Sequence, residues 1–370
     1  MELDTGVTNN RVFRRKADPR PAQRVTTSSQ PQSGETRPVC KYWIQGYCKF
    51  GDENCKFLHS WSLGDDVSLV ATLEGHKKSV TGIVLPSGSD KLYTGSKDGT
   101  MRVWDCSSGH CLRHFNLGGG VGCMFSAEPW VVVGLPNAVK AFNTHNDAEL
   151  VTLRLSAPAN FGQVYALAGG NGMLFAGTHD GSILTWSCNP ATNLFEPAAP
   201  LRGHTHGVVS LAIGGGRLYS GSIDSSIKVW SLENLQCVQT LMDGHAKVVM
   251  SLVCCSDQFL FSCSLDQKLK IWVPNDQSGN KNLELTYTHT EKDGLLALCG
   301  THDSEGNAVM LCSCNDDTLR LYDLPSFSER GRIFSKGEIR AIQAGPQGLF
   351  FTGHGTGPVR VWKLMKLPKS

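Results

Sequence analysis

The sequence predicts an all-β protein whose main body is a ring of seven similar sheets. The first observation is a repeat, because runs such as IKVW, LKIW and VRVW end in a tryptophan, at Trp104, Trp186, Trp230, Trp272 and Trp362. The gaps are 82, 44, 42 and 90 residues (104 to 186, 186 to 230, 230 to 272 and 272 to 362). The long gaps are close to twice the short ones, and Phe142 in AVKAF and Tyr322 in LRLY fill the missing places. A period of about forty residues, built of short strands and turns, is typical of a β-propeller.

Polar residues recur inside the same period. A Gly-His pair begins three repeats, an aspartate precedes the tryptophan by six residues in four, and a Ser or Thr precedes that aspartate by four residues in three. This pattern resembles the WD40-repeat family, and the resemblance implies a buried hydrogen-bond network in each strong blade. By position, the networks are His76–Thr94–Asp98–Trp104, His204–Ser220–Asp224–Trp230 and His245–Ser262–Asp266–Trp272. The third repeat keeps only Asp180 and Trp186, and repeats two, six and seven depart further.

The two ends of the ring are predicted to meet in one blade. The strand-like run VSLVATL, residues 67–73, stands before the first Gly-His pair, and little chain follows Trp362. This run therefore supplies the outer strand of the last blade, which leaves no sheet edge open. Residues 353–357, GHGTG, are expected to form the hairpin turn of that blade. The prediction is a seven-bladed WD40 β-propeller over residues 67–370.

A separate cluster of cysteine and histidine precedes the ring. Cys40, Cys48, Cys55 and His59 are spaced C-x7-C-x6-C-x3-H. Three thiolates and one imidazole form a closed ligand set for a structural zinc ion. A segment this short buries no core of its own, so one Zn²⁺ would supply its folding free energy. If Cys55–His59 forms a helical turn, the last two ligands project from one face.

Aromatic and basic residues are interleaved with these ligands. The pattern resembles the CCCH zinc-finger family over residues 38–60, and the resemblance implies that Phe50 and Phe57 occupy the positions at which RNA-binding fingers insert rings between bases. Further candidates for contact with nucleic acid are Tyr42, Tyr47, Lys49 and Lys56. Each base stacked on a ring is worth about 1–3 kcal/mol. The alternative is that the rings only pack around the metal, and Asp52 adds acidic charge that weakens binding.

Charge and composition divide the chain into three parts. Residues 1–61 hold ten Lys/Arg against six Asp/Glu, a balance of +4, whereas residues 62–370 hold 25 against 27, a balance of −2. This favours a polyanionic partner at the basic end. Residues 1–36 are rich in Arg, Pro, Ser, Thr and Gln, and we expect a disordered basic tail there. The zinc finger is assigned to residues 37–60. The tail is either a nuclear-import signal or phosphate-binding arm, or has no partner.

Fourteen cysteines do not indicate a secreted disulfide framework here. The N-terminus has no apolar signal segment, and no apolar run approaches the roughly 18 residues of a membrane helix. We therefore expect reduced thiols in a nuclear or cytoplasmic protein that is not secreted and has no membrane partner. A second metal site at Cys254–Cys255 or Cys312/Cys314 is disfavoured, because no histidine lies at ligand spacing.

The combination of finger and propeller resembles a plant family of CCCH zinc-finger proteins with WD repeats, which is described as nucleic-acid-binding. The first hypothesis is a non-enzymatic adaptor, whose finger binds single-stranded RNA or DNA and whose propeller recruits protein partners. The second is a purely protein–protein interaction scaffold, in a ubiquitin or chromatin assembly, whose finger does not bind nucleic acid. Four residues that precede the repeat aspartates are expected near the narrow rim as a protein-binding patch: Lys97, His179, Ile223 and Leu265.

Catalysis is not expected on the propeller. The recurring His, Ser and Asp residues are of the types found in a hydrolase triad. The same trio recurs in three repeats, however, whereas an active site is needed once. We therefore interpret these residues as structural.

Overall fold

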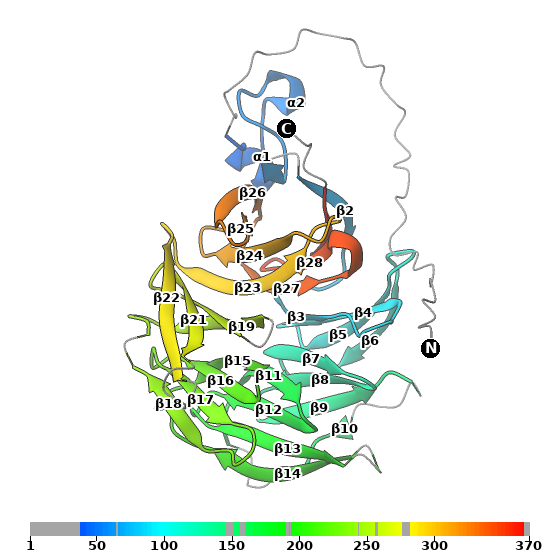
Figure 1. The fold of residues 1–370 in the computed structure, drawn as a ribbon. Coiled ribbons are helices and arrows are strands. Elements are labelled where there is room, and N and C mark those ends of the chain that lie inside the picture. The colour runs from blue at the N-terminus through cyan, green and yellow to red at the C-terminus, as the bar shows by residue number, and fades with distance from the viewer. Residues whose placement is uncertain are drawn as a thin grey trace, which may run out of the picture.

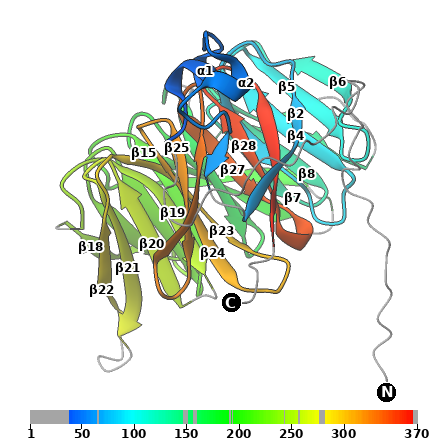
Figure 2. The same cartoon turned by 90° about the horizontal axis from the view of Figure 1, so that it is seen from above.

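The structure is a computed structural model that describes residues 38–365 except for 64–65, 146–150, 156–159, 190–191, 193, 243, 256–257 and 276–281. Within these residues, seven antiparallel sheets form the blades of a β-propeller (Figures 1 and 2). Neighbouring innermost strands contact each other around the whole ring. The predicted all-β, seven-bladed fold is thus confirmed. The expected disordered tail, residues 1–36, lies outside the described residues.

The strands of each blade follow one another in the chain. Blade one comprises β3 (Val80–Val84), β4 (Lys91–Ser96), β5 (Thr100–Asp105) and β6 (Cys111–Asn116); blade two β7 (Cys123–Ala127), β8 (Trp130–Leu135), β9 (Ala138–Asn143) and β10 (Val151–Thr152); and blade three β11 (Val164–Gly170), β12 (Met173–Thr178), β13 (Ile183–Asn189) and β14 (Leu194–Leu201). Blade four comprises β15 (Val208–Gly214), β16 (Arg217–Ser222), β17 (Ile227–Ser231) and β18 (Cys237–Leu241).

The remaining blades complete the ring. Blade five comprises β19 (Val249–Cys255), β20 (Phe259–Ser264), β21 (Lys268–Asn275) and β22 (Asn282–Thr290), and blade six β23 (Leu295–His302), β24 (Ala308–Cys314), β25 (Thr318–Asp323) and β26 (Ser328–Phe334). Blade seven comprises β27 (Ile339–Ala344), β28 (Leu349–His354), β29 (Val359–Leu364) and β2 (Val67–Leu73), with a 3-10 turn over Pro346–Gly348.

The core of the propeller lies between the blades. Seven clusters of buried apolar side chains each combine residues from two neighbouring blades, so that every junction in the ring is filled. All seven repeat aromatics, Phe142 and Tyr322 included, lie on the third strand of their blades and are buried. The repeat of about forty residues therefore corresponds to one wedge of core per blade.

The ring closes as predicted, and an additional strand strengthens the closure. Strand β2 pairs with β29, with Leu69 opposite Trp362. Strand β1 (Ser62–Leu63) adds a fifth strand to blade six by pairing with β26, which the sequence did not predict. The buried Arg330 on β26 donates to Asp303 Oδ2 (2.9 Å) and to the carbonyl of Met365 (2.9 Å), directly after β29. Blade six thus fastens both ends of the described propeller.

Two further expectations concern helices and cysteines. Neither described helix, of five and four residues, has the length and apolar character needed to cross a membrane.

All fourteen cysteines lie in the described part of the chain as free thiols. Cys312 and Cys314 are buried, Cys254 and Cys255 are half-buried, and the one cluster with metal-site geometry among the described residues is in the finger.

Candidate metal centre and interaction surfaces

Short backbone elements position the first three ligands of the finger. Helix α1 (Lys41–Gln45) begins at Cys40, whose Sγ accepts a hydrogen bond from the backbone N–H of Trp43 (3.4 Å). The helix ends at Gly46, whose φ of 90° is the left-handed conformation that glycine adopts most readily. Helix α2 (Gly51–Asn54) lies between Cys48 and Cys55.

The backbone from Cys55 to His59 is not helical: it bends at Lys56 and Phe57 and forms a β-bridge at Leu58, so the helical turn considered above does not form. Cys55 has φ −81° and ψ 130°. The Leu58 N–H donates to the carbonyl of Pro38 (3.0 Å), and the Cys40 N–H donates to the carbonyl of Leu58 (2.8 Å). This pairing between the two ends of the finger brings the last ligand beside the first. The ligands therefore converge through a long-range backbone contact, which the local spacing could not reveal.

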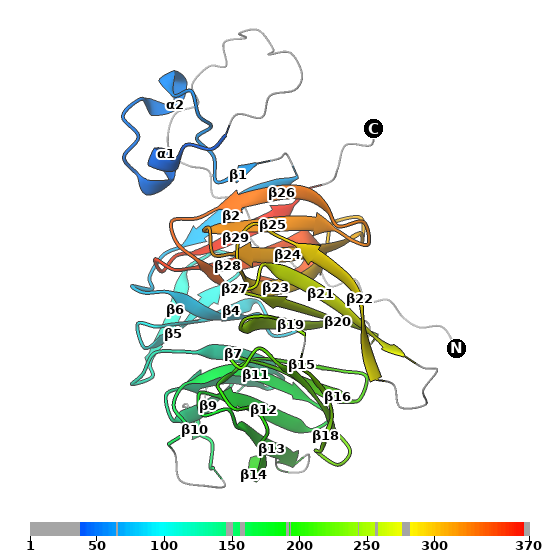
Figure 3. The ribbon, with the colours of Figure 1, turned by 90° about the vertical axis from the view of Figure 1, so that its left-hand side faces the viewer.

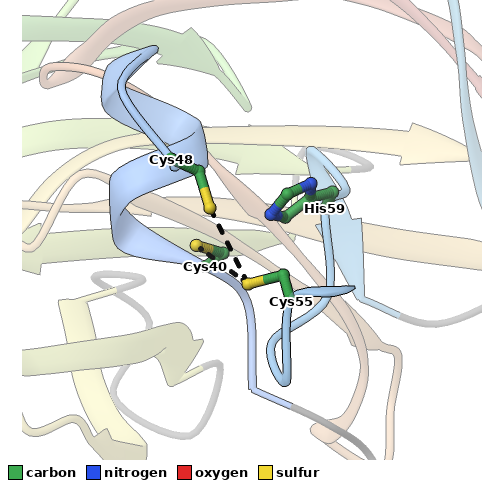
Figure 4. A group of neighbouring side chains, drawn as sticks. All are labelled: Cys40, Cys48, Cys55 and His59. Atoms are coloured by element: carbon green, nitrogen blue, oxygen red, sulfur yellow. Dashed lines mark hydrogen bonds between the residues drawn. The ribbon is translucent and has the colours of Figure 1, made fainter. Parts of the chain in front are cut away.

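The four side chains face a common centre (Figure 4). One ligand atom from each lies within 4.8 Å of the others, and Cys55 Sγ is 3.8 Å from Cys48 Sγ and 3.7 Å from Cys40 Sγ. Tetrahedral coordination at a zinc–sulfur distance of about 2.3 Å separates two sulfurs by roughly 3.8 Å. His59 Nε2 is buried and has no protein hydrogen-bond partner. The donor set, its spacing and the unpaired nitrogen all fit zinc.

Asp52 orients the histidine ligand. His59 Nδ1 lies 2.5 Å from Asp52 Oδ1, and the side chain of His59 is almost fully buried while that of Asp52 is exposed. A carboxylate that accepts from one imidazole nitrogen fixes the tautomer and leaves the other nitrogen free for the metal. Sequence reasoning treated Asp52 only as unfavourable charge. Because Asp52 is close to His59 in space rather than through a familiar spacing, its role was missed.

The same contacts change the acidity of the ligands. Burial opposes ionisation of the Cys40 thiol, but the Trp43 N–H and the neighbouring thiol groups lower its pKa to about 7. The hydrogen bond with Asp52 raises the pKa of His59 to about 9 because it stabilises the protonated ring, so zinc must displace the Nε2 proton when it binds while Nδ1–H stays on Asp52. A thiolate is the metal-binding form of cysteine, so the environment of Cys40 favours metal binding.

The candidate nucleic-acid residues point outwards. The exposed fractions are 62% for Tyr42, 61% for Tyr47, 66% for Phe50 and 48% for Phe57. Lys49 and Lys56 are exposed as well. The ring that packs against the ligand set is the half-buried Trp43, which stacks on His59 at a centroid distance of 5.5 Å. These four exposed rings therefore do not form the packing around the metal.

The finger lies next to β1, β2 and β26 (Figure 3). A stack of side chains connects it to the rim of the propeller. Trp43 packs against Trp61 (5.0 Å between ring centroids), and the Arg360 guanidinium on β29 lies 3.5 Å from the centroid of Trp61. The backbone N–H of Phe334 donates to the carbonyl of Trp61 (2.8 Å), next to β1. The zinc ligand His59 is thus linked by contacts to blades six and seven.

The propeller histidines and aspartates are engaged in hydrogen bonds. In blade four, Trp230 Nε1 donates to Ser220 Oγ (2.8 Å), Ser220 Oγ lies 2.8 Å from His204 Nε2, and His204 Nδ1 lies 2.9 Å from Asp224 Oδ2. Blade one has the same contacts among His76, Thr94, Asp98 and Trp104, and blade five among His245, Ser262, Asp266 and Trp272. The hydroxyl residue at the centre of each network is fully buried.

Ionisation states fit these networks. Burial lowers the pKa of His76, His204 and His245, so each ring is neutral and donates from Nδ1. Desolvation works against the ionised form of Asp224, but the Ser226 hydroxyl and backbone N–H together with His204 lower its pKa to about 2. Each carboxylate is tolerated because its oxygens accept several hydrogen bonds.

In blades three, six and seven, other hydrogen bonds or ion pairs take the place of the complete His–Ser/Thr–Asp–Trp network. Trp186 Nε1 donates to the carbonyl of Arg154 (2.6 Å). In blade seven, Trp362 Nε1 donates to Thr352 Oγ1 (2.8 Å), which lies 2.8 Å from His354 Nε2. Blade six has a buried Arg320 paired with Glu291, Asp293 and Asp316. The GHGTG segment is at the β28–β29 hairpin as expected, yet its histidine also completes a network.

His354 could have been found from the sequence. Thr352 precedes Trp362 by ten residues (362 − 352), the same separation as between Ser220 and Trp230. The histidine was missed because it lies on β28 itself, instead of in a Gly-His pair before the blade.

The candidate protein-binding residues lie around the mouth of the central channel. Lys97, Ile223 and Leu265 line a cavity of about 660 Å³ that is bordered by the innermost strand of each of the seven blades. His179 does not line it; its Nδ1 lies 3.1 Å from the hydroxyl of Tyr165, which does. The cavity has an apolar side at blades four to six and carries Lys97 and Arg340 on the other side.

Comparison with known proteins shows to which family the chain belongs. The model of the CCCH-type zinc finger matches residues 38–60, and that of the WD domain, G-beta repeat, matches residues 67–105, 195–231 and 235–273. Zinc finger CCCH domain-containing protein 48 of Arabidopsis thaliana is 59% identical over 329 residues, which cover 89% of this chain and 74% of that protein. The chain belongs to this family of plant CCCH zinc-finger proteins. Zinc finger CCCH domain-containing protein 17 of Oryza sativa subsp. japonica is 56% identical over 324 residues, covering 88% of this chain and 72% of that protein.

A solved structure supports the propeller of this CCCH zinc-finger protein. The WD40 β-propeller domain of Doa1 aligns with a TM-score of 0.67 and 19% identity, covering 81% of this chain and 97% of that chain. At this identity the likeness shows the fold alone. The matches to the WD domain fall on blades one, four and five, which hold the three complete His–Ser/Thr–Asp–Trp networks. Together, the CCCH match and the Cys3His cluster establish the finger as a zinc-binding domain.

The contact between Asp52 and His59 predicts a specific effect on zinc affinity. Asp52→Ala should weaken zinc binding by about 10–100-fold, because loss of such a carboxylate partner leaves the imidazole unoriented. Competition with a chromophoric chelator measures this affinity. Lys49→Ala in the same segment is the control and should bind zinc as the wild type does. Equal affinity of Asp52→Ala and wild type would contradict the orienting role.

The propeller networks predict a loss of stability in Ser220→Ala. The substitution leaves Trp230 Nε1 and His204 Nε2 buried without partners, at a cost of about 1–3 kcal/mol for each group. Chemical denaturation followed by tryptophan fluorescence should show a lower midpoint. The exposed Ser187→Ala on β13 is the matched control and should leave the midpoint unchanged. A Ser220→Ala midpoint equal to that of the control would refute a structural network.

Proposed function

We propose that this protein is a non-enzymatic adaptor whose zinc finger binds single-stranded RNA or DNA and whose propeller recruits a protein. In this proposal the finger spans residues 37–60 and the propeller residues 67–370, with residues 1–36 as a basic tail. Cys40, Cys48, Cys55 and His59 hold the zinc. Fourteen free thiols fit a reducing compartment, so we place its action in the nucleus or the cytoplasm.

The observation that carries nucleic-acid binding is the exposure of the four finger rings. An aromatic side chain of a small domain normally contributes to the core, and here Trp43 fills that role against His59. Tyr42, Tyr47, Phe50 and Phe57 present flat apolar faces to solvent, which is favourable only with a partner that covers them. Unpaired bases stack on such faces without regard to sequence.

Charge on the finger supports the same proposal. Lys41, Lys49 and Lys56 are exposed around the rings. Asp52, the acidic residue that weighed against binding, is within 2.5 Å of the imidazole of His59 and serves the metal site. Few cations nevertheless mean weak binding that falls steeply with salt.

We propose a non-enzymatic function because the propeller residues that resemble a hydrolase triad have a structural role. Each Ser or Thr of the complete networks is held between a tryptophan and a histidine and is fully buried. A nucleophile needs access to its substrate, which these hydroxyls lack. The same arrangement also recurs in three blades.

The second candidate function is a scaffold that contacts only proteins. It is favoured by the cavity at the channel mouth, where Ile223 and Leu265 present apolar surface and Lys97 a cation. Ubiquitin or chromatin assemblies are candidate settings. In that case the finger rings would cover a protein surface, and nucleic acid would not bind.

Fluorescence anisotropy with fluorescein-labelled single-stranded RNA and DNA separates the two functions. The adaptor predicts that Phe50→Ala/Phe57→Ala binds at least tenfold more weakly than wild type, since each lost stack removes about 1–3 kcal/mol. The matched control is Phe259→Ala, an exposed phenylalanine on β20 of the propeller. Zinc content is measured for every variant. Equal binding by wild type and the double variant, with zinc retained, would leave the scaffold as the function.

A further inference from the structure

Lys336 brings a positive charge of the propeller to the finger. This residue lies in the connection between β26 and β27 and is exposed. A side chain on Gly46 would begin 3.4 Å from Lys336 Nζ. Gly46 is the left-handed residue that ends α1, and Tyr47 follows it directly. The Lys336 ammonium therefore stands at the turn that presents an exposed ring of the finger.

This ammonium is available to an outside anion. The two neighbouring arginines are already engaged, Arg332 with Glu329 and Arg340 with Glu338. Lys336 has no ion-pair partner in the described part of the chain. An exposed lysine without a carboxylate partner keeps its three N–H donors for solvent or for a ligand.

Two exposed tyrosines flank the Gly46 turn, where the Tyr47 N–H donates to the carbonyl of Tyr42 (2.9 Å). Tyr42 and Tyr47 meet edge to face with ring centroids 5.8 Å apart, and both are exposed by more than half. A strand whose bases stack on such rings carries a phosphate at every nucleotide. The finger itself supplies little charge to meet these phosphates, because three lysines oppose Asp52 and Glu53 over residues 38–60, a balance of +1.

Contacts between the finger and the propeller fix the position of the finger relative to Lys336. The Trp43–Trp61–Arg360 stack and the pairing of β1 with β26 hold the finger against blades six and seven. β26 ends at Phe334, two residues before Lys336. The strand that anchors the finger thus leads directly into the segment that carries the lysine.

We propose that Lys336 binds a backbone phosphate of the nucleic-acid strand that stacks on Tyr42 and Tyr47. The nucleic-acid surface is then composite: it begins on the finger and continues onto the connection between blades six and seven. The inference rests on the proposed nucleic-acid binding and adds to it a residue outside the finger. The competing role for Lys336 is to neutralise the carbonyl end of α1, which needs no ligand.

The test uses the full-length protein and a fluorescein-labelled single-stranded RNA of mixed sequence, over a series of salt concentrations. Loss of one phosphate contact on a single strand makes the negative slope of log K against log salt shallower by about 0.7, which corresponds to roughly fivefold weaker binding at 0.1 M salt. Lys336→Gln should show both changes, and Lys336→Arg should retain wild-type binding. Lys247→Gln is the matched control, because Lys247 is an exposed lysine in the corresponding connection before blade five.

The outcomes separate this inference from the proposed function. If wild type binds, Phe50→Ala/Phe57→Ala weakens binding and Lys336→Gln does not, the composite surface is overturned and the finger interface stands. Weaker binding by Lys336→Gln with an unchanged salt slope, or with loss of zinc, assigns Lys336 to the support of α1 and also overturns the inference. If the wild type does not bind the RNA, both proposals fail.

Discussion

The convergence of three thiols and one imidazole on a single point is the constraint on which the functional part of this molecule depends. The finger buries few apolar side chains, Ile44 among them, and could not hold its shape by burial alone. Sulfur separations of 3.7 and 3.8 Å match those of a tetrahedral zinc site, and Asp52 holds the imidazole in place. From His59 the contacts continue through Trp43 and Trp61 to Arg360. Metal, finger and propeller rim are therefore physically continuous.

The propeller and the finger orient their characteristic side chains in opposite directions. In the propeller, His204, Ser220 and Asp224 are turned inwards and satisfy one another, which stabilises a blade and keeps these three side chains away from any substrate. In the finger, the aromatic rings that a core would normally bury, such as Phe50 and Phe57, are turned outwards. The propeller thus provides a rigid support, and the exposed chemistry is concentrated on the finger and at the mouth of the channel.

The sequence predicts those features that repeat or depend on local spacing. The seven aromatic positions, the closure by β2 and the ligand set all follow from periodicity or from residue type. The features that were missed depend on contacts between distant segments. Asp52 reaches His59, β1 joins β26, and the Leu58 N–H donates to Pro38 and so brings the last ligand beside the first. The Arg320 cluster of blade six uses different residue types in the place of the repeated network, so no repeat indicates it.

The central claim is that the outward-facing rings of the finger are the surface that meets nucleic acid. Photo-crosslinking of the full-length protein to a thiouridine-containing single-stranded RNA, with adducts located by mass spectrometry, tests it most directly. The account predicts adducts on Tyr42, Tyr47, Phe50 or Phe57 that disappear when zinc is removed by a chelator. Adducts confined to the mouth of the propeller channel, or adducts on the finger that persist without zinc, would contradict it.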